Sequence, residues 1–306
     1  MPQIAVITHE SDNFAGWKYL LKTLIGAWKQ QGIETVVVKK PQDYVPADAA
    51  FVHVDLTVVP QETIDLAGRY PVAINRRAVD TRKRAYSKLL LDEDSNYNGP
   101  VIVKTDANCG GWREFRNSIS ASLAGRMTRR LGGFETYLRY RARCEAARPW
   151  ACRRLLRTEE YPVFGYACAV PKGIWRNPHL IVEKLLCERT GSVYCVRNYK
   201  FLGSREGNFR IKSRNLVVKF GGSIEMLDEP VPASVRALRE QLGLDYGKID
   251  YAMVDGEPVI YDVNRTTGNA DDERALDAVF ARLQDGIWDF LPVKGQPARS
   301  SAAAHA

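Results

Sequence analysis

The sequence contains few of the residues that usually hold a zinc ion. It has four histidines and six cysteines in 306 residues, and the cysteines show no Cys-x-x-Cys spacing and no clustering with histidine. This scarcity argues against a structural zinc site. Long apolar runs are also missing, and the N-terminus has no charged segment followed by an apolar core. We therefore expect a cytoplasmic protein with reduced thiols and no membrane partner.

The overall composition is that of a globular protein with an excess of positive charge. Hydrophobic residues make up 45% of the chain and charged residues 26%, with a formal net charge of +8 and an isoelectric point near 9.1. A chain of this length can bury a sizeable core and form two or three subdomains. The positive balance indicates an anionic partner, which could be a nucleotide, a phosphorylated substrate or a nucleic acid.

The first 80 residues alternate short apolar strands with helices, which predicts a parallel α/β layer. The first strand–helix turn lacks a Gly-x-Gly-x-x-Gly fingerprint, and this argues against dinucleotide binding there. His53 and Asp55 follow the third strand at its carboxyl end, where they could contact a ligand or serve the fold alone. The expected strands are Gln3–Thr8, Thr35–Val38, Ala49–Val54 and Pro71–Ile74, and the expected helices are Phe14–Trp28 and Gln61–Gly68.

A buried strand then runs into a lysine and a pair of glycines. Three β-branched residues precede Lys104, and Gly110 and Gly111 follow after a polar turn. A lysine at the end of a buried strand is poorly solvated and favours an anionic neighbour. Paired glycines can let backbone N–H groups close around phosphate oxygens, although a Gly-Gly turn after a strand is also common.

Two basic segments flank this strand. Arg76–Leu91 is expected to be a helix with a solvated basic face, and Trp112–Leu156 to be helical and rich in arginine. The second segment could bind nucleic acid, in which case retention on DNA or RNA would fall steeply with salt. Its arginines are spread all round the helices, however, and its aromatic residues resemble core anchors. We therefore favour an anion-facing insertion and expect no nucleic-acid partner.

The C-terminal half consists mainly of strands. We expect them at Pro162–Val170, Pro178–Glu188, Ser192–Phe201, Asn208–Lys212 and Leu216–Lys219, followed by a helix at Val231–Leu242. A further helix is expected at about Asp272–Leu283, and the tail from Pro292 is expected to be disordered.

The stretch 248–264 has the pattern of a β-hairpin with a turn at Asp255-Gly256. Strand alternation places Asp250 and Asp262 on the same face only if the connecting loop has an odd number of residues. Two neighbouring carboxylates repel each other unless a cation compensates, and a Mg²⁺ ion with oxygen ligands would do so. The alternative is a solvated hairpin face with ordinary acids.

The order of these motifs resembles the ATP-grasp superfamily. A strand ending in Lys104 precedes the glycine pair, Val-Glu-Lys-Leu-Leu follows at 182–186, and Tyr-Asp-Val-Asn-Arg-Thr-Thr-Gly stands at 261–268. The resemblance covers about Met1 to Phe290 and implies two α+β subdomains that hold ATP between them. The implied division is an N-terminal α/β (pre-ATP-grasp) domain at 1–80, an ATP-grasp subdomain with the Arg-rich insertion at 81–180, a second subdomain with the nucleotide and metal site at 181–291, and a tail at 292–306.

The resemblance also implies roles for individual residues, all at positions that match the family's motifs. The residues implied to bind ATP are Lys104 at the α and β phosphates, Gly110 and Gly111 in a loop over the phosphates, Glu183, Lys184 and Leu186 at the adenine, and Glu188 at the ribose. The implied ligands of one or two Mg²⁺ ions are Asp250, Asp262 and Asn264, with Lys248 facing the transferred phosphate and either Lys83 or Lys88 nearby. Asp262 stands where most members have glutamate, so the metal would lie closer to the strand.

The activity that the resemblance implies is ATP-dependent ligation. Phosphorylation of a substrate carboxylate would give an acyl phosphate, which an amine or a similar nucleophile then attacks. We expect one of Arg197, Arg210 and Lys212 to hold the acyl phosphate or the carboxylate; the alternative for each is a basic surface residue. An ATP-dependent small-molecule kinase and a regulatory ATP-binding protein stay open as alternatives. The expected partners are a small carboxylate and a nucleophile, and a homodimer also stays open.

Overall fold

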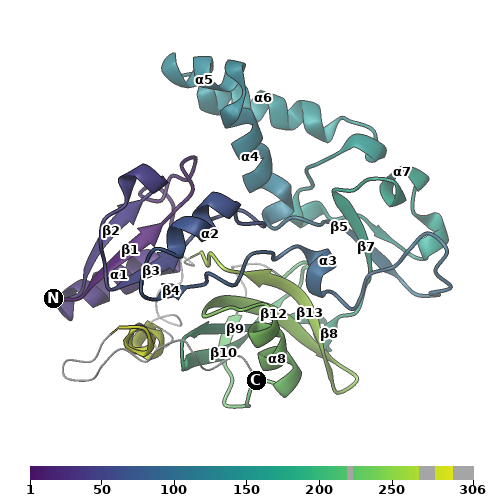
Figure 1. Cartoon of the computed structure of the whole chain (residues 1–306). Coiled ribbons are helices and arrows are strands. Elements are labelled where there is room, and N and C mark those ends of the chain that lie inside the picture. Colours follow the sequence, from purple (N-terminus) through teal and green to yellow (C-terminus); the bar gives the residue numbers. More distant parts are fainter. Residues whose placement is uncertain (219–222, 269–279, 292–306) are drawn as a thin grey trace.

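The computed structural model describes residues 1–218, 223–268 and 280–291. Three sheets form its framework, and a helical projection extends from one side (Figure 1). Most of the helix expected at Asp272–Leu283 and the whole tail from Pro292 lie outside the described residues. Within these ranges no helix has both the length and the apolar character needed to cross a membrane.

The N-terminal sheet is parallel and has the strand order β2-β1-β3-β4. Its apolar strands β1 and β3 are buried between two apolar clusters, as is usual for parallel strands that are covered on both faces. The predicted α/β layer is therefore confirmed. Its elements are β1 (Gln3–Ile7), α1 (Leu20–Gln30), β2 (Glu34–Val38), β3 (Ala49–Val52), α2 (Gln61–Ala67) and β4 (Ala73–Ile74).

Helix α1 starts later than the spacing of apolar residues predicts. The expected helix begins at Phe14, but the backbone of Tyr19 bridges to Gly268, and the Leu20 N–H donates to the Thr267 carbonyl at 2.9 Å. This pairing with a distant segment accompanies the extended backbone of Tyr19, so the helix begins at Leu20. Phe14 still packs into the core from the turns that precede α1.

A small antiparallel sheet carries the strand that contains the predicted lysine. Its order is β6-β5-β7, with β5 at Val101–Thr105, β6 at Val163–Phe164 and β7 at Leu180–Lys184, so β6 and β7 are shorter than predicted. The basic helix expected at 76–91 is reduced to one turn, α3 (Lys83–Tyr86). Its flanks pair elsewhere, because the Thr81 N–H donates to the Thr57 carbonyl at 3.0 Å and the Leu91 N–H to the Val182 carbonyl at 2.9 Å.

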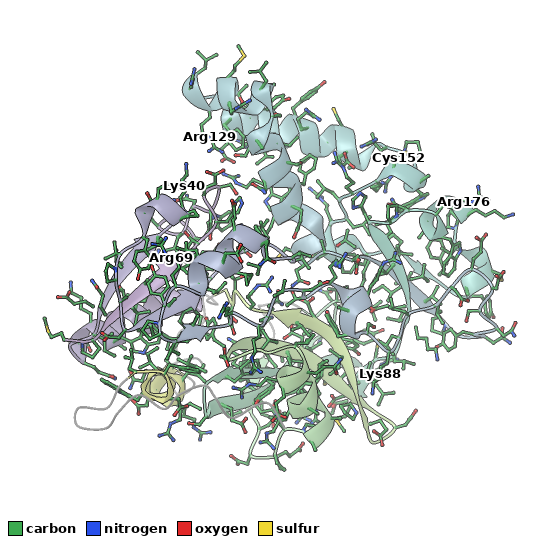
Figure 2. The ribbon with its side chains drawn as sticks, in the orientation of Figure 1. Lys40, Arg69, Lys88, Arg129, Cys152 and Arg176 are labelled. Carbon is green, nitrogen blue, oxygen red and sulfur yellow. The ribbon has the colours of Figure 1, made fainter. Side chains whose placement is uncertain are left out.

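The Arg-rich segment folds into helices that project away from the sheets, with Arg129 near their far end (Figures 1 and 2). They are α4 (Trp112–Ala121), α5 (Leu123–Arg130) and α6 (Phe134–Ala146), and α7 (Lys172–Trp175) follows before β7. A small apolar core of their own packs α4 against α6. The segment was expected to stay helical to residue 156, but α6 ends at Ala146 and is followed by short 3-10 turns. Such turns lie at Pro41–Asp43, Cys109–Gly111, Trp150–Cys152, Thr158–Glu160, Ala167–Ala169 and Gln284–Asp289.

The C-terminal sheet is antiparallel and carries the hairpin at one edge. Its order is β11-β10-β9-β12-β13, with β8 beside β9, and helix α8 (Ala233–Gln241) packs Val235 against one of its faces. Residues 216–218 form no strand, which corrects the prediction there. The strands are β8 (Glu188–Thr190), β9 (Val193–Leu202), β10 (Arg205–Ser213), β11 (Ser223–Met226), β12 (Tyr246–Val254) and β13 (Glu257–Asn264).

The hairpin loop has an even number of residues, so the predicted odd length is wrong. Val254 pairs with Glu257, and only Asp255 and Gly256 connect them. Both connecting residues have positive φ, 51° and 84°, as a two-residue hairpin turn requires.

A β-bulge supplies the shift that the loop does not. Tyr251 pairs with Ile260, but Asp250 pairs with Asp262, so Tyr261 is an extra residue in β13. Beyond the bulge each side chain of β13 points to the face opposite to the one that simple alternation predicts. The two carboxylates consequently lie opposite each other on one face, while Ile260 packs into the apolar core on the other.

Two buried side chains join the N-terminal layer to the C-terminal sheet. The Asn75 side chain accepts hydrogen bonds from the N–H groups of Asp245 and Tyr246, both at 2.9 Å. Arg265, which follows the hairpin directly, donates to the carbonyl groups of residues 56 and 57 at 2.6 and 2.8 Å. The bonds of Arg265 place the loop that follows β3 next to the end of the hairpin.

His53 belongs to the core and contacts no ligand site. Its side chain is fully buried, and the rings of Phe14 and Tyr19 pack edge-on against it at 5.4 and 4.6 Å between centroids. Neither ring nitrogen has a hydrogen-bond partner among the described residues. Burial lowers the pKa of His53 to about 4.

We expect the free energy of unfolding to decrease as the pH falls from about 6.5 to about 4, because the unfolded imidazole takes up a proton that the buried one does not. The loss attributable to His53 should be on the order of 3 kcal/mol. Urea unfolding at a series of pH values should show that the free energy of unfolding of His53→Leu depends less on pH than that of the wild type. The exposed His179→Leu serves as the control and should keep the wild-type slope. An unchanged slope in His53→Leu would contradict this assignment.

Candidate functional site

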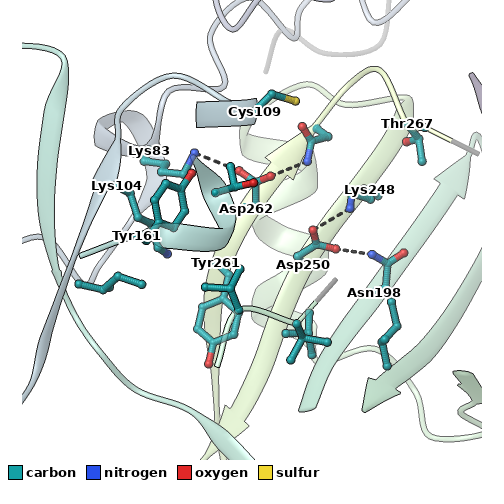
Figure 3. Close-up of a pocket in the computed structure, with 18 of the residues that line it drawn as sticks. Lys83, Lys104, Cys109, Tyr161, Asn198, Lys248, Asp250, Tyr261, Asp262 and Thr267 are labelled. Atoms are coloured by element: carbon teal, nitrogen blue, oxygen red, sulfur yellow. Dashed lines mark hydrogen bonds and ion pairs between the residues drawn. The ribbon is translucent and has the colours of Figure 1, made fainter. Parts of the chain in front are cut away.

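A cavity of about 650 Å³ lies between the three sheets. Side chains of β5, β7, β9, β12 and β13 line it, and residues 16–19 together with Asp55 contribute from the N-terminal layer. The centre of the cavity is charged, as Figure 3 shows. The fold thus brings together side chains that are far apart in the sequence.

The hairpin carboxylates lie at the centre of the cavity, and each is paired with a lysine (Figure 3). Lys248 Nζ lies 2.7 Å from the Asp250 carboxylate, and Lys83 Nζ lies 3.1 Å from that of Asp262. The Asn264 amide donates to Asp262 at 2.6 Å. The structure therefore brings together all three residues predicted as metal ligands, and it selects Lys83 over the exposed Lys88 as the neighbouring lysine.

Burial and charge together set the protonation of this cluster. Burial raises the pKa of Asp250, although Lys248 opposes it. Burial acts in the same direction on Asp262, but Lys83 and Lys248 outweigh it and hold the pKa of Asp262 below its usual value. Burial, assisted by Lys248, lowers the pKa of Lys200 to about 7. An anion placed beside Lys200 would favour its charged form.

A second buried ion pair lies between β5 and β7. Lys104 Nζ is 2.8 Å from the Glu183 carboxylate, and the two side chains are 10% and 1% exposed. Lys104 lines the cavity, whereas Glu183 lies behind it. Glu183 was predicted at an adenine, but here its carboxylate holds Lys104.

One end of the cavity is apolar. The last residue of β7 and the three that follow it, 184–187, line it together with apolar side chains of β9. The predicted residues Lys184 and Leu186 are both among them. Tyr261, the bulge residue, also lines this end, and its hydroxyl donates to the Leu186 carbonyl. The hairpin bulge thus brings an aromatic ring against this segment.

Four other predicted residues do not line the cavity. Arg197 Nε lies 3.0 Å from the Glu188 carboxylate, and Arg210 and Lys212 both reach Glu225 at 2.9 Å. Glu188 also accepts a hydrogen bond from a backbone N–H of β12 at 2.9 Å. These side chains form an ion-pair network outside the cavity. None of them would therefore contact a ligand bound in the cavity.

The glycine pair does not line the cavity either. Gly110 and Gly111 have φ values of 65° and 77°, and a β-carbon on them would lie 2.0 Å from the Leu156 carbonyl oxygen and 2.5 Å from that of Arg154. Glycine is needed because a second backbone segment passes close to the start of α4. The neighbouring Cys109 does line the cavity.

The cavity residues that were not predicted from the sequence include Asn198 and Lys200 of β9. The Asn198 amide donates to the Asp250 carboxylate, and Lys200 is buried close to it. Strand alternation offered a signal, because 198 and 200 must share a face that 197 does not. Which of the two faces meets the cavity depends on the packing of the sheet, and the sequence does not show that.

No protein-family model matches this chain, and no curated protein matches its sequence. Similar solved structures include a RimK domain protein ATP-grasp from Sphaerobacter thermophilus, with 14% identity, TM-score 0.47 and coverage of 94% of this chain and 99% of that one. Another is D-alanine–D-alanine ligase from Bacillus anthracis in complex with ATP, with 12% identity, TM-score 0.45 and coverage of 95% of this chain and 96% of that one. A third is a Chryseobacterium gregarium RiPP-associated ATP-grasp ligase in complex with ADP and a leader and core peptide, with 13% identity, TM-score 0.40 and coverage of 99% of this chain and 100% of that one. Two of the three are described as ATP-grasp proteins, the superfamily that the motifs of this sequence resemble. The similarity is distant, so we draw the function from the side chains of the cavity.

Proposed function

We propose that this protein is an ATP-dependent ligase of the ATP-grasp type, which activates a substrate carboxylate as an acyl phosphate. The charge arrangement of one cavity carries this proposal. Buried ammonium groups are costly unless anions neutralise them. Three of the four central lysines have a carboxylate partner, whereas Lys200 forms no ion pair with any residue that the structure describes. A polyphosphate would supply the missing negative charge. The charged residues that line the cavity centre are Lys83, Lys104, Lys200 and Lys248 with Asp250 and Asp262.

The cavity offers a separate place for each part of ATP. The apolar end beside residues 184–187 and Tyr261 suits the adenine ring. Lys104 lies beside that end, with its Nζ 5.4 Å from the centre of the Tyr261 ring, and Lys200 lies opposite Lys248 next to the carboxylate pair, so both would contact the phosphates. Gly110, Gly111 and Glu188 have no part in this arrangement.

The hairpin suits a magnesium ion. Asp250 and Asp262 offer hard oxygen ligands, with the Asn264 amide next to them. Among the described residues no group of three or more His, Cys, Asp or Glu side chains gathers to hold a metal, so water and phosphate oxygens would complete the coordination, as is usual for Mg²⁺. When bound, Mg²⁺ neutralises negative charge on the phosphate oxygens.

The residues of the chain would act by position and charge. A substrate carboxylate oxygen attacks the γ-phosphorus, ADP leaves, and an amine then displaces phosphate from the acyl phosphate. Lys248, fixed by Asp250 at 2.7 Å, would stabilise charge on the transferred group. Lys200 would take up or keep its proton beside the same oxygens, because a neighbouring anion raises its pKa.

We also propose three units in the chain. The parallel sheet lies within 1–80, and the small antiparallel sheet begins with β5. Since β7 pairs with β5, we place the second boundary after residue 184 and not at 180.

Trapping the acyl phosphate tests the proposal. We expect the protein, incubated with MgATP, a panel of carboxylic acids and hydroxylamine, to form ADP, phosphate and the hydroxamate of one acid. A kinase would form a stable phosphorylated product instead, and a regulatory protein would bind ATP without turnover. Failure to bind MgATP at millimolar concentration would exclude all three.

A further inference from the structure

The cavity continues past the hairpin carboxylates to its other end, which is polar. Trp17, Tyr19, Asp55, Arg113 and Thr266 line it. The phosphate-binding residues proposed above do not include any of them. Only Asp55 stood out in the sequence, as a polar residue after a strand. This end of the cavity therefore has no assigned ligand.

Arg113 is held there in a defined orientation. It is the second residue of α4, and its side chain is 18% exposed. Its Nε lies 2.7 Å from the Asp55 carboxylate, and its guanidinium carbon lies 4.0 Å from the centre of the Trp17 ring. The ion pair with Asp55 and the contact with the face of the Trp17 ring hold the guanidinium group at this end of the cavity.

Asp55 is itself fixed by two hydroxyl groups. Tyr19 donates to one of its oxygens at 2.8 Å, and Thr266 donates to the other at 2.8 Å. With Arg113, both oxygens of Asp55 already have partners. Asp55 is therefore a positioning residue for Arg113.

The guanidinium group of Arg113 has unused donors, because even Nε, which lies close to Asp55, makes no hydrogen bond to a residue that the structure describes. Neither Nη1 nor Nη2 donates a hydrogen bond to any of the residues that the structure describes. Two parallel N–H groups on a planar guanidinium match the two oxygens of a carboxylate. Because the group is largely shielded from water, an unused fork here favours a bound oxyanion.

The surrounding charges favour a carboxylate over a phosphate. Asp12 lies 3.0 Å from the same Tyr19 hydroxyl that contacts Asp55, so two carboxylates lie near Arg113. Their negative charge opposes a dianion more strongly than a monoanion. A singly charged carboxylate is the better match.

We propose that Arg113 binds a substrate carboxylate other than the one that ATP activates. This inference rests on the proposed function, because the reacting carboxylate must lie at the phosphates. The free carboxylate has two potential sources. It belongs either to the activated acid, which is then a dicarboxylic acid, or to the nucleophile, which is then an amino acid or a peptide.

Calorimetric titration of the whole protein without nucleotide tests this, with two matched probe pairs: glutarate against butyrate, and alanine against ethylamine. We expect the member with the additional carboxylate to bind at least about 10-fold more tightly in one pair. Discrimination in the first pair assigns the carboxylate to the activated acid, and discrimination in the second assigns it to the nucleophile. Arg113→Lys and Arg113→Met should each weaken that binding about 10- to 100-fold, since lysine lacks the fork.

Arg116→Lys is the matched control. Arg116 lies one turn further along α4 and also pairs with an acid, Glu135, at 2.7 Å, so its replacement should leave the affinity unchanged. Thermal unfolding checks that the variants are folded. Equal binding within both pairs, binding of no probe, or undiminished affinity in the Arg113 variants overturns the inference. MgATP binding, measured on the same samples, decides the ligase proposal separately: bound MgATP without discrimination overturns only the role of Arg113, and discrimination without MgATP binding overturns only the ligase.

Discussion

Replacing Asp262 by asparagine is expected to reduce Mg²⁺-dependent ATP turnover by about 10²- to 10³-fold. Asp262 lies opposite Asp250 across the hairpin, and its pKa is held below the usual value, so it is ionised at neutral pH and can contribute a full negative charge to a metal site. Asparagine keeps the shape and removes that charge. Release of ADP, followed with a coupled assay at several Mg²⁺ concentrations, measures the effect.

Stability has to be followed in the same experiment. The substitution leaves Lys83 buried without its 3.1 Å partner, and breaking a buried pair from one side costs about 3–5 kcal/mol. Asp255→Asn is the matched control, because it removes the same charge from the exposed turn of the same hairpin, where asparagine tolerates the positive φ. We expect this control to keep full turnover. Normal turnover in a folded Asp262→Asn variant would rule out the metal site.

The hairpin shows how far side-chain patterns could predict this site. The Asp-Gly turn and the alternating runs on either side predicted both strands and the pairing of Asp250 with Asp262. The route to that pairing was wrong, because a bulge at Tyr261 provides the shift that an odd loop was expected to provide. A bulge changes the backbone register and requires no particular residue, so the sequence carries little trace of it.

Strand β9 shows a second limit. Arg197 and Lys200 are both basic residues of one strand, and Arg197 was the one predicted to contact substrate. In the structure Lys200 lines the cavity, while Arg197 pairs with Glu188 and Glu229 outside it. Alternation separates the two residues, but only the packing of the whole sheet decides which face meets the cavity.

The glycine pair shows a third limit, since two different structures require the same residues. A phosphate loop needs glycine so that its backbone can approach oxygens, and Gly110 and Gly111 need it so that residues 154–156 can pass close by. The sequence correctly indicated a close approach to this backbone. It did not indicate what approaches.

Lys104→Met is expected to weaken nucleotide binding by about 10- to 100-fold, because one charge-assisted contact with a phosphate contributes roughly 1.5–3 kcal/mol. Lys104 Nζ lies 5.4 Å from the centre of the Tyr261 ring at the apolar end of the cavity, and methionine keeps most of the length of lysine without the charge. Equilibrium titration with ATP and with ADP measures the loss. The exposed Lys172→Met should bind both nucleotides as the wild type does.

Stability and binding can be separated at this position, because the partner of Lys104 is known. The single substitution leaves Glu183 charged and buried, at a cost of about 3–5 kcal/mol, whereas Lys104→Met combined with Glu183→Gln removes both charges and should recover most of the lost stability. If Lys104 contacts phosphate, the double variant should be stable and still bind nucleotide weakly. If Lys104 serves only the ion pair, nucleotide affinity should return together with stability. Titration of the double variant with ATP distinguishes these two outcomes. Recovered nucleotide affinity would show that Lys104 does not belong to the proposed ATP site.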